Sequence, residues 1–166
     1  RAADDHPPHG SRLMEIAPPP PTAALQLSSR LEQMEALVAW FDQLWPAAAP
    51  ANAPEALRLQ AQTALVEAFS NAVRHAHRDL PADTPIDIRW ISNQEALQLE
   101  VVDQGPPFQS EAAFPELREL MSRGEAHPSQ RDEHWGLLIF VRLCDRHGWQ
   151  ISSEQPRSEE HTSELQ

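Results

Sequence analysis

The chain has 166 residues and a formal net charge of −12, and 40% of its residues are hydrophobic. This balance predicts one globular domain with flexible ends, and the acidic charge without a basic cluster argues against a nucleic-acid surface. The sequence contains no lysine, which excludes a lysine-dependent P-loop, and its single cysteine, Cys144, excludes an internal disulfide. With no apolar run long enough to cross a membrane, we expect a cytoplasmic protein without membrane contact.

The first part of the chain predicts an arm, a strand and a helix. Residues 1–23 are rich in proline, which favours extended backbone and predicts a disordered arm. Residues 24–29 alternate in polarity like a short edge strand. From residue 30 to about residue 45, apolar side chains recur at helical spacing. We expect Pro46 to end this helix and to begin a linker of alanine and proline.

A second, longer helix is predicted from about residue 56 to residue 78. Small and apolar side chains gather on one side of its helical wheel, which suits packing against a sheet. Polar side chains gather on another side: Glu67, Asn71, Arg74, His75 and Arg78. Two alternating segments, residues 86–90 and 97–101, predict a pair of strands with a hairpin loop between them.

The last part of the chain predicts two more helices and a further strand. Residues 109–135 are mostly polar, with a short helix expected near residues 114–121. Gly136 begins a nearly all-apolar segment that reads as a buried helix, and Gly148 is expected to end it. A strand is predicted to begin at residues 149–153.

The pair Glu67 and Asn71 is the first candidate for chemistry. Residues four apart lie on the same helix face, so these side chains should stack. A carboxylate beside an amide oxygen can hold hydrated magnesium and can accept a proton. Such a pair is also ordinary on a solvated helix, so it carries little weight alone.

Two glycines mark the other candidate groups. Asp103 ends a strand and is followed by Gly105, which lets backbone approach a ligand, and a carboxylate there can accept a hydrogen bond from an adenine amine. Phe108 could cover an apolar base edge. Gly136 precedes a buried helix, and helix N-termini favour phosphate. Each of these features is also compatible with an ordinary turn or with tight packing.

Taken in order, the three stretches resemble the motifs of the GHKL superfamily of ATPases and kinases, and most closely the anti-sigma-factor serine kinases. Glu67-Ala-Phe-Ser-Asn71-Ala-Val-Arg-His75-Ala76 is similar to the N-box of that family. Val101-Val102-Asp103-Gln104-Gly105 resembles the first glycine box, and the segment from Gly136 to Asp145 resembles the second. The resemblance implies an α/β two-layer sandwich with a mixed, mainly antiparallel sheet and helices on one face. Its final strand would be truncated.

The resemblance also implies roles for individual residues. Glu67 would be the general base towards a protein serine, Asn71 would coordinate Mg²⁺, and Asp103 would bind the adenine of ATP. Residues 109–135 would form a lid over the phosphates. The remaining side chains and backbone implied at the nucleotide are these: His75, Gly105, Phe108, Gly136 and Leu137.

The implied partners are a sigma factor, held inactive, and a small anti-anti-sigma protein of the STAS type that receives the phosphate. A homodimer is also implied. Residues 24–156 would make up the ATP-binding kinase domain. Residues 157–166 resemble the translation of a sequencing-adapter oligonucleotide, so we expect a non-native tail there.

Two alternative functions remain open from the sequence. His134 stands where the second box of the family usually has its first glycine, which also allows a binding module that sequesters a partner without catalysis. The ATP-binding domain of a sensor histidine kinase is the other alternative. His75 and His77 lack ligand partners at metal-binding spacing, which favours a positioning or surface role for both.

Overall fold

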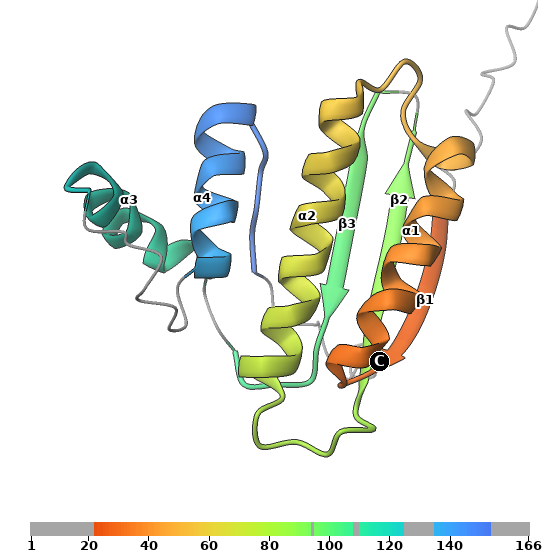
Figure 1. The fold of residues 1–166 in the computed structure, drawn as a ribbon, viewed down its shortest axis with the longest axis horizontal. Coiled ribbons are helices and arrows are strands. Elements are labelled where there is room, and N and C mark those ends of the chain that lie inside the picture. The colour runs from red at the N-terminus through yellow and green to blue at the C-terminus, as the bar shows by residue number, and fades with distance from the viewer. Residues whose placement is uncertain (1–21, 94, 108–109, 125–134, 154–166) are drawn as a thin grey trace, which may run out of the picture.

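The computed structural model describes residues 22–93, 95–107, 110–124 and 135–153. It is an α/β two-layer sandwich in which helices cover one face of an antiparallel sheet (Figure 1), as the sequence predicted. The strands are β1 (Thr22–Ser28), β2 (Pro85–Ser92) and β3 (Leu97–Val102), in the order β1-β2-β3. The helices are α1 (Met34–Ala48), α2 (Glu55–Asn71), α3 (Phe114–Ser122) and α4 (Trp135–His147). Among the described helices, none is long and apolar enough to cross a membrane.

Alternation along β2 sets the two faces of the sheet. Ile86, Ile88 and Trp90 are fully buried against the helices, whereas the intervening side chains point to the other face. Antiparallel pairing continues the pattern, because Ile88 lies opposite Leu25 of β1 and Val101 of β3. The predicted strands are therefore confirmed, with β1 beginning two residues earlier than expected.

The prediction that Pro46 ends the first helix is wrong. After a short 3₁₀ turn, Leu31–Gln33, helix α1 runs through Pro46 to Ala48. Proline removes one backbone donor, but here it lies in the last turn, where little of the helix remains to be disrupted. Trp45 stacks on Phe41 with ring centroids 5.5 Å apart and meets Trp90 edge-on at 6.0 Å. This aromatic packing holds the last turn of α1 on the sheet.

Helix α2 ends differently from the single regular helix that the sequence predicted. From Ala72 to Ala76 the chain forms a π-helical turn, closed by the amide of His77, which donates to the carbonyl of Ala72 at 2.8 Å. A bond that spans five residues accommodates one residue more than an α-helical turn does, so later side chains shift around the axis. His77 consequently points inward, and only 3% of it is exposed.

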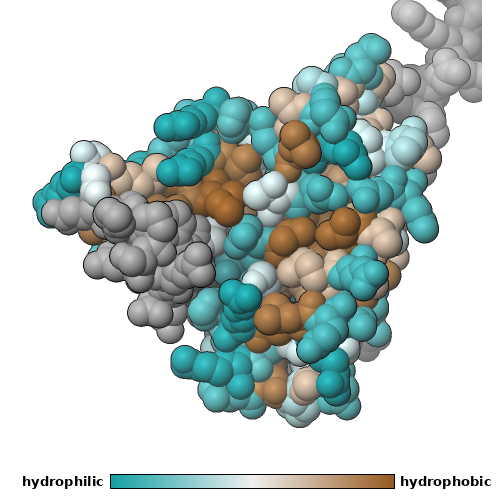
Figure 2. Space-filling model, in the orientation of Figure 1, coloured by the Kyte–Doolittle hydropathy of each residue, from teal (hydrophilic) through white to brown (hydrophobic). Residues whose placement is uncertain are grey.

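The core has two parts that meet at α2. One lies between the sheet and the pair α1 and α2, around Phe41, Phe69 and Trp90. The other joins α2 to α3 and α4, which lie on the side of α2 away from α1 (Figure 1). In the space-filling view, apolar surface lies over the α1–α2 region and over α4, among hydrophilic residues (Figure 2). Helix α2 thus contributes side chains to both parts of the core.

The strand predicted at residues 149–153 is absent, and this segment is irregular. Gly148, with φ 70°, ends α4 as expected, since a left-handed conformation favours glycine after a helix. Trp149 then packs against both parts of the core, and its indole N–H donates to Gln60 of α2 at 2.9 Å. These contacts with α2, rather than a strand partner, fix the segment. The predicted arm and tail, residues 1–23 and 157–166, lie outside the described residues apart from Thr22 and Ala23 in β1.

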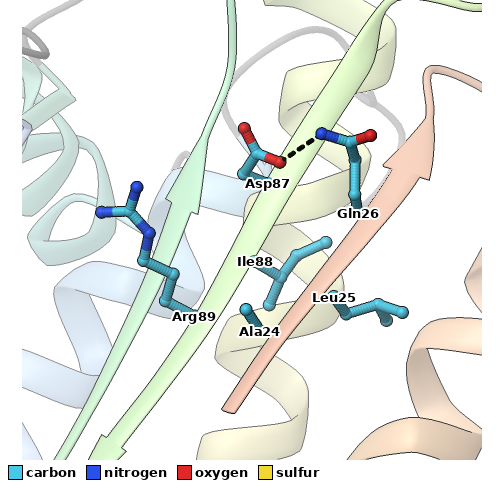
Figure 3. Close-up of a pocket in the computed structure, with 6 residues that line it drawn as sticks. All are labelled: Ala24, Leu25, Gln26, Asp87, Ile88 and Arg89. Atoms are coloured by element: carbon cyan, nitrogen blue, oxygen red, sulfur yellow. Dashed lines mark hydrogen bonds between the residues drawn. The ribbon is translucent and has the colours of Figure 1, made fainter. Parts of the chain in front are cut away.

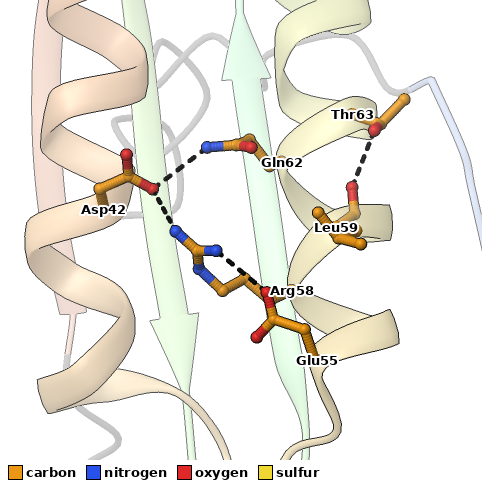
Figure 4. Close-up of polar contacts among 6 residues, drawn as sticks. All are labelled: Asp42, Glu55, Arg58, Leu59, Gln62 and Thr63. Atoms are coloured by element: carbon orange, nitrogen blue, oxygen red, sulfur yellow. Dashed lines mark hydrogen bonds and ion pairs between the residues drawn. The ribbon is translucent and has the colours of Figure 1, made fainter.

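A polar cluster joins α1 to α2 on the outer surface (Figure 4). Arg58 of α2 donates to Asp42 of α1 at 2.7 Å and to Glu55 at 3.1 Å, while the amide of Gln62 donates to the same Asp42 oxygen. Both carboxylates raise the pKa of the Arg58 guanidinium above its ordinary value, chiefly through the hydrogen bond to Glu55. The charged groups of the cluster are largely exposed, so we expect the cluster to contribute little to stability.

Candidate functional site

The N-terminal end of α4 lies directly against the polar face of α2. A methyl group placed on Gly136 would sit 2.9 Å from Oε2 of Glu67 and 3.0 Å from Oδ1 of Asn71. Those distances are shorter than ordinary van der Waals contact, so the two side chains converge on the backbone of Gly136. The structure therefore brings together three residues that the sequence placed in two separate motifs.

The turn after β3 lies against the π-helical end of α2. A methyl group on Gly105 would sit 2.4 Å from the carbonyl oxygen of Ala76 and 2.7 Å from its Cβ. No side chain fits there, so glycine is required by the close approach of two backbones. The Gly105 amide also donates to Oδ1 of Asp103 at 2.8 Å. The carboxylate of Asp103 is thus held at the turn, and its second oxygen is a further acceptor that an exocyclic amine can use.

His77 supplies a further contact to this turn. Its Nε2 accepts a hydrogen bond from the backbone amide of Gln104 at 2.8 Å. His75, which the resemblance placed at the nucleotide, is an exposed residue of the π-helical turn, and its role there stays a prediction. The sequence did single out both histidines, but it could not choose between them, because the choice depends on the extra residue in the helix.

The other predicted residues have different surroundings. The side chain of Leu137 is buried in the core between α3 and α4, so only its backbone amide is in position for a ligand at the start of α4. Phe108 and His134 lie outside the described residues, as do residue 109 and residues 125–134 of the expected lid, whereas its described part contains α3. No three His, Cys, Asp or Glu side chains of the described part of the chain gather as a metal site.

A shallow hollow of about 420 Å³ lies elsewhere, on the open face of the sheet (Figure 3). Gln26 and Asp87 line it and are joined by a hydrogen bond of 2.8 Å between amide and carboxylate. Because Asp87 alternates with the buried Ile86 and Ile88, this hollow faces away from α2 and from Glu67. None of the residues that line it belongs to the N-box or to the two glycine boxes. The candidate site therefore remains at α2, the turn after β3 and the start of α4.

Comparison with known proteins agrees with this geometry. Residues 27–159 match the family model described as a histidine kinase-like ATPase domain. No curated protein and no solved structure matches the chain. The match spans all the described helices, strands β2 and β3, the last two residues of β1, and both glycines that approach α2. It implies ATP binding by the GHKL-type fold. The chain therefore belongs to the histidine kinase-like ATPase domain family.

Proposed function

We propose that this domain is an ATP-dependent serine-protein kinase that regulates a sigma factor. In this proposal it phosphorylates a serine on an anti-anti-sigma protein of the STAS type and otherwise holds the sigma factor inactive. The observation that carries the kinase activity is the convergence of Glu67, Asn71 and Gly136 at the N-terminal end of α4. The partners come from the resemblance of the N-box and glycine boxes to anti-sigma-factor kinases, as do a homodimer and a cytoplasmic location.

The donor atoms at this end suit Mg²⁺ bound with a nucleotide. Mg²⁺ prefers oxygen ligands and usually keeps several waters, with one or two protein groups and substrate phosphates completing its shell. The amide oxygen of Asn71 would supply the protein ligand, and the carboxylate of Glu67 lies beside it at the same glycine. When bound, the ion would neutralise charge on the phosphates.

Glu67 has the position and chemistry of a general base. In phosphoryl transfer a positioned carboxylate accepts the proton of the attacking hydroxyl, while the nucleophile and leaving group lie roughly in line. The serine oxygen forms its bond to the γ-phosphorus as the bond to the β-phosphate oxygen breaks, so ADP leaves. Backbone amides at the start of α4 are available to the phosphate oxygens, since a helix N-terminus carries unpaired donors.

The test is phosphate transfer from Mg-ATP to a purified anti-anti-sigma protein by the full chain. Glu67→Ala should lower the transfer rate by about 10²–10⁴, because a general base typically contributes that much. ATP should still bind, since Asp103 and the turn are untouched. Glu35→Ala changes an exposed acidic residue in the first turn of α1, away from the site and the lid; it is the matched control and should leave the rate unchanged.

Unchanged transfer by Glu67→Ala would remove Glu67 from this role. An absence of heat and of thermal stabilisation with millimolar Mg-ATP would contradict the kinase as a whole. Together with capture of a sigma factor, that second result would favour the module that sequesters a partner.

A further inference from the structure

The imidazole of His77 is buried between α2 and the turn that follows β3. Only 3% of the residue is exposed, and its Nε2 lies 2.8 Å from the backbone nitrogen of Gln104. The amide N–H is the donor, so Nε2 must present a lone pair. This bond joins the end of the N-box helix to the middle residue of the Asp103-Gln104-Gly105 turn.

This geometry allows only one protonation state of the ring. A neutral imidazole carries one proton, and an imidazolium carries one on each nitrogen. Because Nε2 accepts a hydrogen bond, the proton lies on Nδ1 and the ring is neutral. Nδ1 is buried and has no hydrogen-bond partner among the described residues. A buried donor without an acceptor is unusual and destabilising. The unpaired Nδ1–H therefore indicates that this ring orientation is kept for the contact that Nε2 makes with the turn.

The reason lies in the turn that His77 holds. Gly105 is pressed against Ala76, and its amide is bonded to Asp103, so the turn is fixed on both sides of Gln104. Two of these three contacts come from Ala76 and His77, which are consecutive residues at the end of the π-helical turn. The hydrogen bond from Gln104 is accepted by the side chain of His77, which follows the π-helical turn, and Gln104 is next to Asp103 in the chain.

We propose that His77 is a positioning residue for nucleotide binding, acting as a neutral acceptor that holds the Gln104 backbone so that Asp103 faces the base. This rests on the proposed binding of ATP, in which Asp103 takes the adenine amine. Without the bond, the turn populates other conformations, and the apparent affinity falls by the fraction that remains competent. The loss affects adenosine and ATP alike, because His77 acts at the base end and not at the phosphates.

The first test needs neither nucleotide nor mutation. Long-range ¹H–¹⁵N correlation spectra of the full chain, labelled at the histidine ring nitrogens, report which nitrogen carries the proton. For His77 the expected result is a protonated Nδ1 and an unprotonated Nε2. A proton on Nε2, or a doubly protonated ring, would overturn the proposal whether or not the chain binds ATP.

The second test compares variants of similar size. His77→Leu removes the acceptor, and we expect it to weaken adenosine and Mg-ATP binding by the same factor, on the order of tenfold. His77→Gln places an amide oxygen near the position of Nε2 and should restore most of the affinity. His147→Leu, at the exposed end of α4, is the control and should bind as the parent does.

Amide hydrogen exchange separates failure of this inference from failure of the kinase proposal. The Gln104 amide should exchange faster in His77→Leu than in the parent, without nucleotide and at a temperature where both are folded. Unchanged exchange at Gln104, or unchanged adenosine affinity in a folded His77→Leu, would contradict the positioning role. If the parent binds no nucleotide, the kinase proposal and the role of His77 in nucleotide binding both fail, while the ring protonation and Gln104 exchange still decide whether His77 holds the Gln104 turn. Should His77→Leu not fold, the spectra of the parent chain decide it.

Discussion

The two ends of the site are both built by a glycine that approaches α2, but the atoms that each glycine meets are different. Gly105 meets the backbone of Ala76, with a methyl position 2.4 Å from its carbonyl oxygen. Gly136 meets the tips of Glu67 and Asn71, with a methyl position 2.9 Å from the nearer oxygen. Backbone cannot move aside without distorting a helix, whereas the ends of side chains can rotate. The end at Gly105, where we propose that the adenine base binds (the base end), is therefore fixed by the fold. The end at Gly136, where we propose that the phosphates bind (the phosphate end), is set by two adjustable side chains.

Gly136→Ala should separate activity from stability. The new methyl can be accommodated by rotating Glu67 and Asn71, and alanine is a better helix residue than glycine, so stability should change by less than about 1 kcal/mol. Displacement of the Glu67 carboxylate by about 1 Å is enough to lower phosphate transfer about 100-fold. Parallel measurements of transfer rate and unfolding midpoint check this. A large fall in stability, with activity retained, would mean that the fold, and not the geometry of phosphate transfer, requires glycine at position 136.

Gly105→Ala should have the larger effect on the fold. Its methyl would overlap the backbone of Ala76, and overpacking of this kind costs about 1–3 kcal/mol. The turn must shift, so adenosine and ATP binding should weaken together. Denaturant unfolding and nucleotide titration measure the two effects.

Gly148→Ala is the control for glycine loss in general. Gly148 has φ 70°, and a methyl group placed on it would meet no atom within 4 Å, so its replacement strains the backbone without a clash. We expect about 1–2 kcal/mol of destabilisation and unchanged nucleotide affinity. If Gly105→Ala gave the same pattern as this control, the close contact with Ala76 would not be needed for binding.

The smallest expected effect concerns the attachment of α4 to α3. Arg118 donates to both carboxylate oxygens of Asp145, at 2.9 Å from Nε and 2.7 Å from Nη2, which holds the pKa of Asp145 below its ordinary value. A depressed folded pKa stabilises the protein above the ordinary value of about 3.9, and this stabilisation is lost as the pH falls through the folded pKa. Asp145→Asn should therefore lose less stability than the parent between about pH 5 and about pH 3.

Urea unfolding of both proteins across that pH range measures the difference, which should be small because the pair is exposed. Identical acid dependence in the two proteins would show that the ion pair does not stabilise the packing of α3 on α4. The affinity for adenosine should be the same in Asp145→Asn as in the parent.

The sequence predicted much of the fold because its periodicity is strong. Alternation at Ile86, Ile88 and Trp90 predicted a strand, and the apolar segment after Gly136 predicted a buried helix; both are confirmed. Pro46 and the segment after Gly148 were predicted wrongly. Proline is disruptive in isolation, but aromatic packing outweighed it, and a strand needs a neighbour that local alternation does not reveal.

The site was predictable only as separate motifs. Four-residue spacing placed Glu67 and Asn71 on one face, and this part of the helix is regular. No spacing rule indicated that Gly136 would rest on them, because that contact joins residues far apart in the chain. Spacing alone could not choose between His75 and His77, since it assumes a regular helix where the chain forms a π-helical turn.

The π-helical turn makes the number of residues, and not only their identity, part of what the sequence encodes. Deleting one residue between Ala72 and Ala76 would let the segment wind as an ordinary helix and would rotate His77 away from Gln104. No substitution restores such a loss, because a change of side chain cannot alter the winding in the same way. Two chains with identical motifs but a helix that differs by one residue here would differ in how they hold the base.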